Sequence, residues 1–440
     1  MFGSLASVNR FLDVRSGLGF LMGTLPITVP SVRDAEPAAE LTLQAYETLD
    51  ELAALRPAWD ELLSHYPPAT TFSTWEWLSC WWNCFGRNRR LVALALFDSG
   101  SLVGLAPLSI SQERVARWLS LRVLRLMGDG SGDSDNLDFP VRPGYERAFA
   151  ESLLRYLLPR KQPWDVCLLN TLPPDSLVSR CLAEILSASE GTFFEYPSRF
   201  SAVPLPESWD AYAQTLSSED RNNLIRYTRR LQRRYSTRIY RCTMAAELPV
   251  CLEALFRLHQ GRWQIAGQPG SFSPPQRREF YLQLSRDLMA RGCLELWVLE
   301  LNGEIAAVQF AFRYRRRIFQ LQEGYDHTRS SDRLGYVLRG EVLKQLISEK
   351  VRTYDFLGGD DRYKTRWGAR EGQYRHLHFA HKLSAGGLYL QLLDKGGKVK
   401  NWLRMRLPKP AWRVLHAANV VLRRIPSSQA KGDSNRRSRS

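Results

Sequence analysis

The sequence lacks an apolar run long enough to span a bilayer, because charged residues or prolines interrupt its longest candidates. It also lacks the short patterns of a phosphate-binding P-loop, a serine-hydrolase elbow and an HExxH zinc site. Its seven cysteines form no CxxC pair, which indicates buried thiols in a reducing compartment rather than a zinc site. We therefore expect a cytoplasmic protein that is not a hydrolase of those classes.

Two segments imitate metal sites without completing them. Residues 129–138 have the acidic spacing of a calcium loop, but Ser134 stands at the position of the turn glycine and Pro140 at that of the bidentate glutamate. A predicted strand with His376, His378 and His381 could put two imidazoles on one face. No carboxylate or thiolate lies at ligand spacing near them. We expect no metal.

The composition describes a large and basic protein. With 440 residues, of which 44% are hydrophobic and 24% charged, the chain can fill two cores of ordinary size. A formal net charge of +16 predicts an anionic partner. Coenzyme phosphates, nucleic acid, an acidic glycan and a membrane surface all satisfy that requirement, and charge does not choose among them.

The order of sequence patterns predicts five segments. Residues 1–40 lack periodicity and are expected to be a mobile leader, followed by a first lobe at 41–205 and a second lobe at 206–382. A basic helical tail is predicted at 383–425, and a Ser/Arg-rich end at 426–440 is expected to be disordered.

Each predicted lobe contains a strong hairpin pattern. The first hairpin turns at residues 98–100 and the second at Asn302-Gly303, and similar residues flank the two turns. This similarity favours an internal duplication, with two lobes of the same mixed α/β topology.

A strand, a helix and a second strand follow the second hairpin, over residues 318–325, 333–349 and 354–357. This order indicates a parallel crossover, which places the start of the helix beside two strand ends. Free amides at a helix start favour a phosphate, and separating strands can admit an extended pantetheine arm. The alternative is an ordinary crossover with Gly358-Gly359 as a turn.

Arginines are concentrated on a predicted helix over residues 221–235. Four of them are expected to bind an anion: Arg229, Arg230, Arg233 and Arg234. The alternative is an amphipathic helix whose charges are simply solvated.

Three stretches together carry a family resemblance. They are FSTWEWLSCWW at 72–82, RNNLIRYTRRLQRR at 221–234 and YDFLGGDDRYKTRW at 354–367. Over most of residues 41–382 the chain resembles the acetyltransferase domain of CelD-like and BioF-like proteins, which is related to FemAB-type peptidyltransferases and belongs to the GNAT superfamily. The resemblance implies an α/β fold with mixed sheets, in which tandem GNAT-like lobes adopt a FemAB-like arrangement and a helical tail follows.

The resemblance further implies an N-acyltransferase that uses acyl-CoA as co-substrate. In that reaction an amine attacks the thioester directly, so the site needs a base and a proton donor for the departing thiolate. Glu323 and Asp360 are the candidate bases, and Tyr325 and Tyr363 are the candidate donors. Lys364 is expected on the acceptor side, beside Asp360 and Tyr363 at a strand end.

The start of the 333–349 helix is expected to bind the co-substrate through four residues: Arg333, Leu334, Gly335 and Tyr336. The standard GNAT loop has two closely spaced glycines there, whereas this chain offers Gly335 alone. FemAB-type relatives use aminoacyl-tRNA as donor, but the sequence shows no long helical-arm insertion of the kind many of them carry. This difference favours the thioester.

The expected acceptor is an amine on a small molecule or glycan, such as an amino sugar in exopolysaccharide biosynthesis. Two alternatives stay open: an aminoacyl-tRNA-dependent transferase with tRNA as partner, and a non-catalytic binding partner. The basic tail is expected to contact the inner face of the membrane peripherally.

Overall fold

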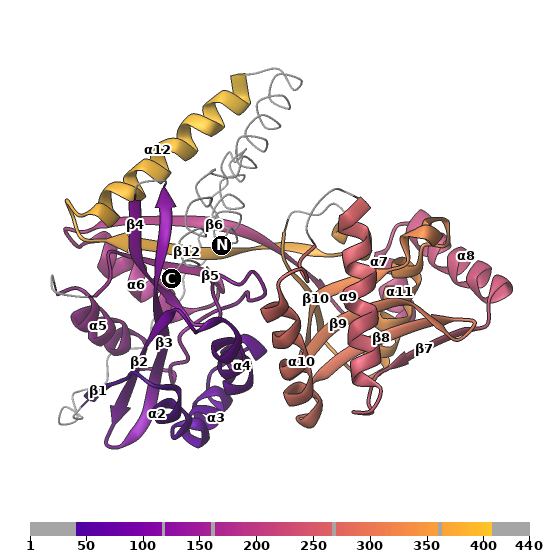
Figure 1. Ribbon diagram of the computed structural model, residues 1–440, viewed down its shortest axis with the longest axis horizontal. Helices are drawn as coiled ribbons and strands as arrows, with labels where there is room; N and C mark the ends of the chain where they lie inside the picture. The colour runs from indigo at the N-terminus through magenta and orange to yellow at the C-terminus, as the bar shows by residue number, and fades with distance from the viewer. Residues whose placement is uncertain (1–40, 117–118, 160–162, 266–269, 360–362, 407–440) are drawn as a thin grey trace, which may run out of the picture.

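The computed structural model describes residues 41–406 apart from 117–118, 160–162, 266–269 and 360–362. The predicted leader at 1–40, the end of the predicted tail at 407–425 and the Ser/Arg-rich end at 426–440 lie outside the described residues. A single mixed sheet runs through the molecule, with helices packed against it (Figure 1). Its twelve strands have the order β1-β2-β3-β4-β5-β12-β6-β11-β10-β9-β8-β7.

The first half of the chain supplies six strands and five α-helices. The strands are β1 (Leu41–Tyr46), β2 (Arg89–Asp98), β3 (Ser101–Ala116), β4 (Leu119–Leu126), β5 (Val166–Leu172) and β6 (Thr192–Pro204). The helices are α2 (Leu49–Ala53), α3 (Arg56–Ser64), α4 (Trp75–Phe85), α5 (Glu146–Leu157) and α6 (Leu177–Ser187).

The second half supplies the remaining strands and helices. Its strands are β7 (Thr237–Arg241), β8 (Leu294–Leu301), β9 (Glu304–Tyr314), β10 (Arg317–Tyr325), β11 (Thr353–Gly358) and β12 (Arg370–Ala380). Its α-helices are α7 (Trp209–Thr215), α8 (Ser218–Arg234), α9 (Leu248–Ile265), α10 (Pro275–Ala290), α11 (Leu334–Ser348) and α12 (Ala385–Arg406). Short 3-10 helices are η1 (Thr71–Ser73), η2 (His327–Asp332) and η3 (Lys364–Trp367).

The two halves repeat one topology. Strands β1 to β4 are antiparallel and β4 pairs with β5 in parallel, and β7 to β11 repeat that arrangement. The hairpin turns match as well, since Ser99 and Asn302 adopt φ of 48° and 52° and each precedes a glycine with positive φ. The predicted α/β fold of tandem lobes with a helical tail is therefore confirmed.

The last strand of each half crosses into the other half. β12 lies between β5 and β6, and β6 in turn borders β11. β6 and β12 pair antiparallel over eleven residues, from Arg370↔Ala202 to Ala380↔Thr192. These two long strands join the lobes into one sheet, and the predicted boundary at residue 205 stays a prediction.

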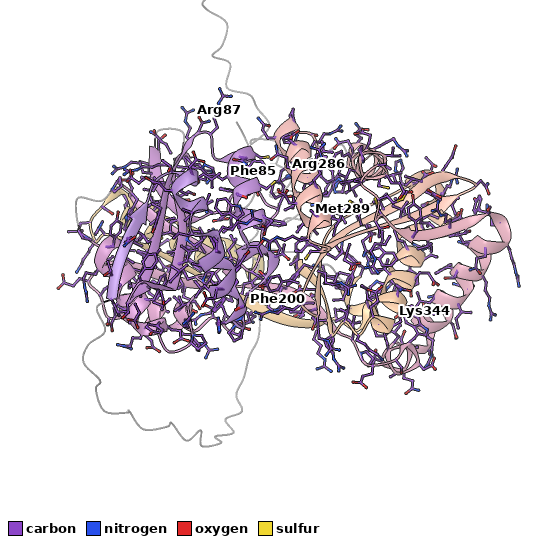
Figure 2. All side chains as sticks on the ribbon, turned by 90° about the horizontal axis from the view of Figure 1, so that it is seen from below. Phe85, Arg87, Phe200, Arg286, Met289 and Lys344 are labelled. Atoms are coloured by element: carbon purple, nitrogen blue, oxygen red, sulfur yellow. The ribbon has the colours of Figure 1, made fainter. Side chains whose placement is uncertain are left out.

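The aromatic helix α4 packs against the second half of the chain. The Trp77 ring lies 5.4 Å from Phe280 of α10 and 5.2 Å from Phe312 of β9. Phe85 continues the contact at 5.5 Å from Phe280, and Figure 2 labels it where α4 meets α10. The cluster of tryptophans in this part of the sequence is therefore core that joins the lobes.

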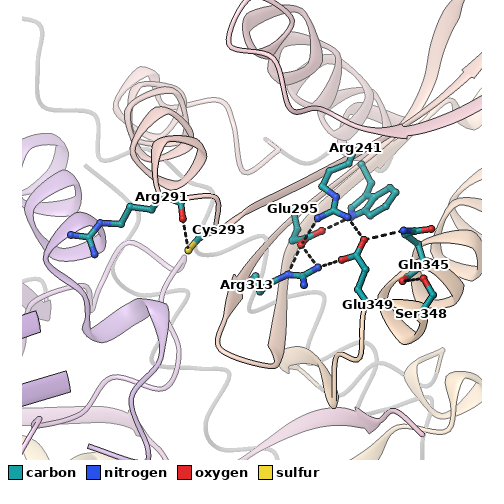
Figure 3. Close-up of polar contacts among 9 residues, drawn as sticks. Arg241, Arg291, Cys293, Glu295, Arg313, Gln345, Ser348 and Glu349 are labelled. Carbon is teal, nitrogen blue, oxygen red and sulfur yellow. Dashed lines mark hydrogen bonds and ion pairs between the residues drawn. The ribbon is translucent and has the colours of Figure 1, made fainter. Parts of the chain in front are cut away.

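A cluster of charges fastens α11 to the sheet (Figure 3). The Glu295 carboxylate is 1% exposed and accepts hydrogen bonds from Arg241 at 3.2 Å and Arg313 at 2.7 Å. Both arginines also pair with Glu349, the C-cap of α11. The cluster therefore holds the end of α11 against β7, β8 and β9.

Within the described ranges, none of the helices combines the length and the apolar character that crossing a membrane requires.

Candidate active site

The parallel strands β10 and β11 separate partway along their length. They pair from Arg317↔Thr353 to Phe319↔Asp355, after which β10 has a register shift near Gln320 and continues beside β9. β11 continues beside β6 instead. The parallel pairing agrees with the predicted crossover. The two strands diverge toward their carboxyl ends, and we call the space between them the wedge.

Helix α11 begins beside the wedge with an unusual cap. Its N-cap Arg333 is in the left-handed region, with φ 56° and ψ 42°, and makes no side-chain capping hydrogen bond. The backbone amides of Tyr336 and Val337 both donate to the Arg333 carbonyl, at 2.9 and 3.0 Å. The amides of Leu334 and Gly335 precede these bonds, in the position where a helix binds an anion.

Two of the four predicted arginines reach this helix start. The Asp332 carboxylate is 2% exposed and accepts from Arg234 at 2.6 Å and from the Tyr235 hydroxyl at 3.0 Å, with Arg230 at 3.7 Å. Arg230 also donates to the Ser331 carbonyl. The charge of Asp332 neutralises part of this cationic group.

Arg229 and Arg233 are exposed on the adjoining face of α8. The structure therefore divides the four arginines into an inner pair at the start of α11 and an outer pair in solvent. That any of the four binds an anion stays a prediction.

Gly335 brings the start of α11 against β10. A Cβ atom at this position would lie 2.6 Å from Glu323 Oε1 and 3.2 Å from Tyr325 Cδ1. A larger residue at this position would displace the Glu323 carboxylate. The structure thus places Glu323, Tyr325 and Gly335, which the sequence assigned to different roles, in direct contact.

The Glu323 carboxylate pairs with Arg339, one turn further along α11. The Arg339 side chain is 6% exposed and its guanidinium lies 5.2 Å from the Tyr363 ring centroid, 5.3 Å from Phe356 and 5.5 Å from Trp367. Burial is the largest influence and works to lower the pKa of Arg339, but the Glu323 carboxylate together with Tyr354 and Tyr363 outweighs it, so the pKa is raised. The ion pair therefore persists inside the wedge, with an aromatic wall around it.

Tyr363 is 43% exposed, so this part of the wall faces solvent. Lys364 is 2% exposed, and its Nζ lies 3.0 to 3.4 Å from four backbone carbonyl oxygens, those of residues 356 to 359, among which its three N–H donors are shared. The ammonium therefore holds the loop after β11 together. Asp360 lies outside the described residues.

The segment that imitates a calcium loop reaches this site from the first lobe. Asp135 Oδ2 accepts from the Gly358 amide at 2.9 Å, and Asp133 accepts from Arg277 at 2.9 Å and Tyr281 at 3.0 Å. Asp355 of β11 is fully buried nearby, and burial raises its pKa to about 6. The acids of this segment hold α10 and β11 through protein contacts.

The strand histidines form a separate polar cluster. His376 Nδ1 and His378 Nε2 lie 3.1 and 2.9 Å from Asn170 Oδ1. Burial lowers the pKa of His376 to about 4, so the ring is neutral at physiological pH. Among the residues the structure describes, no group of His, Cys, Asp or Glu is arranged to hold a metal ion.

Arg339 and Asp135 did not emerge from the sequence as site residues. Arg339 could have been found, because it lies four residues after Gly335 and therefore on the same helical face. Asp135 had no such signal, since the contact joins residues 223 positions apart.

A cavity of about 250 Å³, lined in part by Arg90, Tyr156 and Trp164, lies in the first lobe away from the wedge.

The tandem lobes and the wedge define a GNAT-type transferase fold. Residues 218–365 match the family described as an acetyltransferase (GNAT) domain. The match begins with α8 and ends in η3, so it includes the wedge, the basic helix and Lys364.

Two of the solved structures that match illustrate the similarity of fold. FemX superposes with a TM-score of 0.52 and 11% identity, covering 73% of this chain and 95% of FemX. A conserved protein of unknown function from Bacteroides thetaiotaomicron gives a TM-score of 0.50 and 11% identity, covering 78% of this chain and 100% of that one. Among proteins of curated function, none matches the sequence. The FemAB-related GNAT resemblance is confirmed, and it supports transfer of an acyl or aminoacyl group in general.

Proposed function

We propose that the chain transfers an acyl group from an acyl-CoA thioester to an amine, and that the reaction takes place in the wedge of the second lobe. The observation that carries this proposal is the separation of β10 and β11 beside the start of α11. Separated parallel strands leave backbone groups that can pair with an extended pantetheine arm, and the helix start can receive its phosphates. The inner arginines add positive charge there.

The residues present fit such a co-substrate. The side chain of Arg333, the N-cap of α11, makes no hydrogen bond to the first amides of the helix, so a phosphate can bind them. Gly335 lets the start of α11 lie close to Glu323 and Tyr325 of β10. An acyl-CoA bound here would place its thioester toward Glu323 and Tyr363. The acceptor in this proposal is an amine on a small molecule or glycan, with an amino sugar of exopolysaccharide biosynthesis as the first to test.

The proposed chemistry requires two proton transfers. The amine nitrogen attacks the thioester carbonyl, the C–N bond forms, the C–S bond breaks, and the sulfur leaves as a thiolate. Glu323 or Asp360 accepts the proton of the amine, and Tyr325 or Tyr363 protonates the sulfur. Lys364 supports the acceptor side by holding the loop that carries Tyr363.

The first experiment measures thiol release from acetyl-CoA by the full chain with a panel of amines, amino sugars included. We expect release that depends on the amine, and a lower kcat in Glu323→Gln or Asp360→Asn, whichever removes the base. A decrease of about a hundredfold is typical for loss of a general base. If neither acyl-CoA nor any amine is consumed while the chain is folded, the proposal is wrong.

The arginines of α8 provide a matched pair of variants. Replacing the inner pair, R230Q/R234Q, should raise KM for acyl-CoA, whereas replacing the outer pair, R229Q/R233Q, should leave KM unchanged. Both variants lose two charges from the same helix, so a difference between them reports position and not net charge.

The second candidate function is an aminoacyl-tRNA-dependent transferase, favoured by the exposed outer arginines. In that case R229Q/R233Q should weaken tRNA binding, with a smaller effect as salt increases. Aminoacyl transfer from charged tRNA, without thiol release from any acyl-CoA, would establish this function in place of the first. Binding of either ligand without turnover would indicate the non-catalytic alternative.

A further inference from the structure

Helix α12 has two different faces in the part whose side chains are described, residues 385–396. The inner face packs on the first lobe, where Leu390 is fully buried against Val166, Leu168 and Ala380. A Cβ atom at Gly386 would lie 1.8 Å from the Asp165 carbonyl oxygen, so the helix begins in backbone contact with the strand region of β5. The orientation of α12 at its start is therefore fixed.

The outer face carries a row of exposed leucines. Leu388 is 54% exposed and Leu392 is 53% exposed, and their i, i+4 spacing puts them side by side. Leu383, which immediately precedes the helix, is 99% exposed. Nine large apolar side chains are exposed in the described residues, and three of them lie within residues 383–392. Scattered exposed leucines need no explanation, but a row on a projecting helix does.

Positive charge flanks this leucine row. Lys382 and Lys395 are exposed at its two ends. The remaining sequence of α12 adds Lys398, Lys400, Arg404 and Arg406, with no acidic residue after Asp394. Asp394 faces the inner side, near Tyr196 of β6. Burial of Tyr196 raises the pKa of its hydroxyl to about 12, and the negative charge of Asp394 adds to this rise.

We propose that the outer face of α12 rests on the surface of an anionic lipid bilayer. The charge of the flanking lysines is complementary to acidic headgroups, and the leucines can enter the boundary between headgroups and acyl chains. Figure 1 shows α12 projecting away from the sheet. A nucleic acid would use the same lysines but would gain nothing from exposed leucines, which is why the observations favour lipid.

The experiment measures sedimentation of the full chain with two kinds of vesicle, phosphatidylcholine alone and phosphatidylcholine mixed with phosphatidylglycerol. We expect binding to the mixed vesicles only, decreasing with salt. The L388N/L392N variant should bind at least about tenfold more weakly, because half of each leucine is still available for burial. The K382Q/K395Q variant should lose about fivefold for each lysine removed.

A matched control replaces two exposed apolar residues elsewhere, in L177N/V250N, which are 48% and 64% exposed. This control should bind mixed vesicles like the unchanged chain. Equal binding by L388N/L392N and the control overturns the proposal, as does binding of tRNA but of neither vesicle. Because vesicle binding is measured without substrate, a failed transferase assay does not affect the result.

Discussion

Lys364 belongs to the family signature, and its contacts in the structure are with backbone carbonyls at the end of β11. Its ammonium is buried and surrounded by the carbonyl oxygens of residues 356 to 359, at the end of β11 and directly after it. The sequence placed this lysine correctly after a strand end, because the strand pattern and the two glycines are local features. It could not show that the amine points back at the backbone, since this depends on how the turn closes.

The first prediction concerns this lysine. Lys364→Met should lower the melting temperature, because buried carbonyls lose their donor at a cost of about 1–3 kcal/mol. The control is Lys344→Met on the exposed side of α11 (Figure 2), which removes the same charge from the surface. Thermal unfolding of both variants measures the difference. Equal melting temperatures would show that the four contacts contribute nothing to stability.

The second prediction concerns pH and Asp138, which is buried in the first lobe. Burial raises its pKa to about 7 from an ordinary value of 3.8, against the opposing hydrogen bonds of Tyr66 and Ser176. A raised pKa in the folded state means that folding retains a proton, so stability decreases as pH rises from about 4 through about 7. The change is on the order of 4 kcal/mol for this group alone.

Comparison with Asp138→Asn isolates that contribution, because the amide does not titrate. Melting temperatures measured between about pH 5 and about pH 8 should converge or cross, with the unchanged chain losing stability relative to the variant as pH rises. Parallel curves would mean that Asp138 is already ionised across this range.

At the scale of elements, much of the second lobe could be predicted from periodicity and turn residues. The strand, helix and strand expected at 318–325, 333–349 and 354–357 are β10, α11 and β11, each within one residue at either end. The hairpins were predictable for the same reason, because Asn-Gly and Ser-Gly turns fix both position and register. The pairing of strands from different halves of the chain was not predictable. β6 and β12 pair with each other although nothing in their local sequence indicates it.

Gly335 and Gly340 allow a test of how α11 meets β10. Gly335→Ala should displace the Glu323 carboxylate, which lies 2.6 Å from the added Cβ atom, and so decrease kcat/KM in the proposed reaction. In Gly340→Ala the added atom lies 2.6 Å from Leu224 Cδ2, the end of a flexible side chain outside the wedge. Both changes improve helix propensity by about 1 kcal/mol, so stability should not separate them.

Steady-state kinetics and melting curves of the two alanine variants decide this third prediction. A decrease of about tenfold or more in Gly335→Ala, with little change in Gly340→Ala, is the expected result. The same activity in both variants would mean that the contact between Gly335 and Glu323 does not set the geometry of the site.

At the scale of the whole molecule, an acidic segment of the first lobe adds to the contacts of α4, β6 and β12 that join the two lobes. Asp133 fixes α10 through Arg277 and Tyr281, Asp135 fixes the end of β11, and Asn136 donates to the Tyr374 hydroxyl at 2.9 Å. Sequence spacing suggested a damaged calcium loop at this place. The contacts explain the acids without an ion, but they join distant parts of the chain and leave no local pattern.

The last prediction is that Asp135 positions the proposed site from the other lobe. It accepts the amide hydrogen of Gly358, and the turn that begins there carries Tyr363 and is held by Lys364. Asp135→Ala removes this acceptor and should reduce kcat more than it reduces KM for the acyl donor. Asp135→Asn keeps an acceptor oxygen and should restore most of the activity.

The control is Asp133→Ala, which breaks an ion pair whose carboxylate is fully buried. This change should lower the free energy of unfolding by about 3–5 kcal/mol, and with it the melting temperature. Kinetics and melting curves of the three variants separate the two roles. If Asp135→Ala turns over like the unchanged chain, the first lobe supports the second only as a packing surface, and the geometry of the wedge is set within residues 218–365 alone.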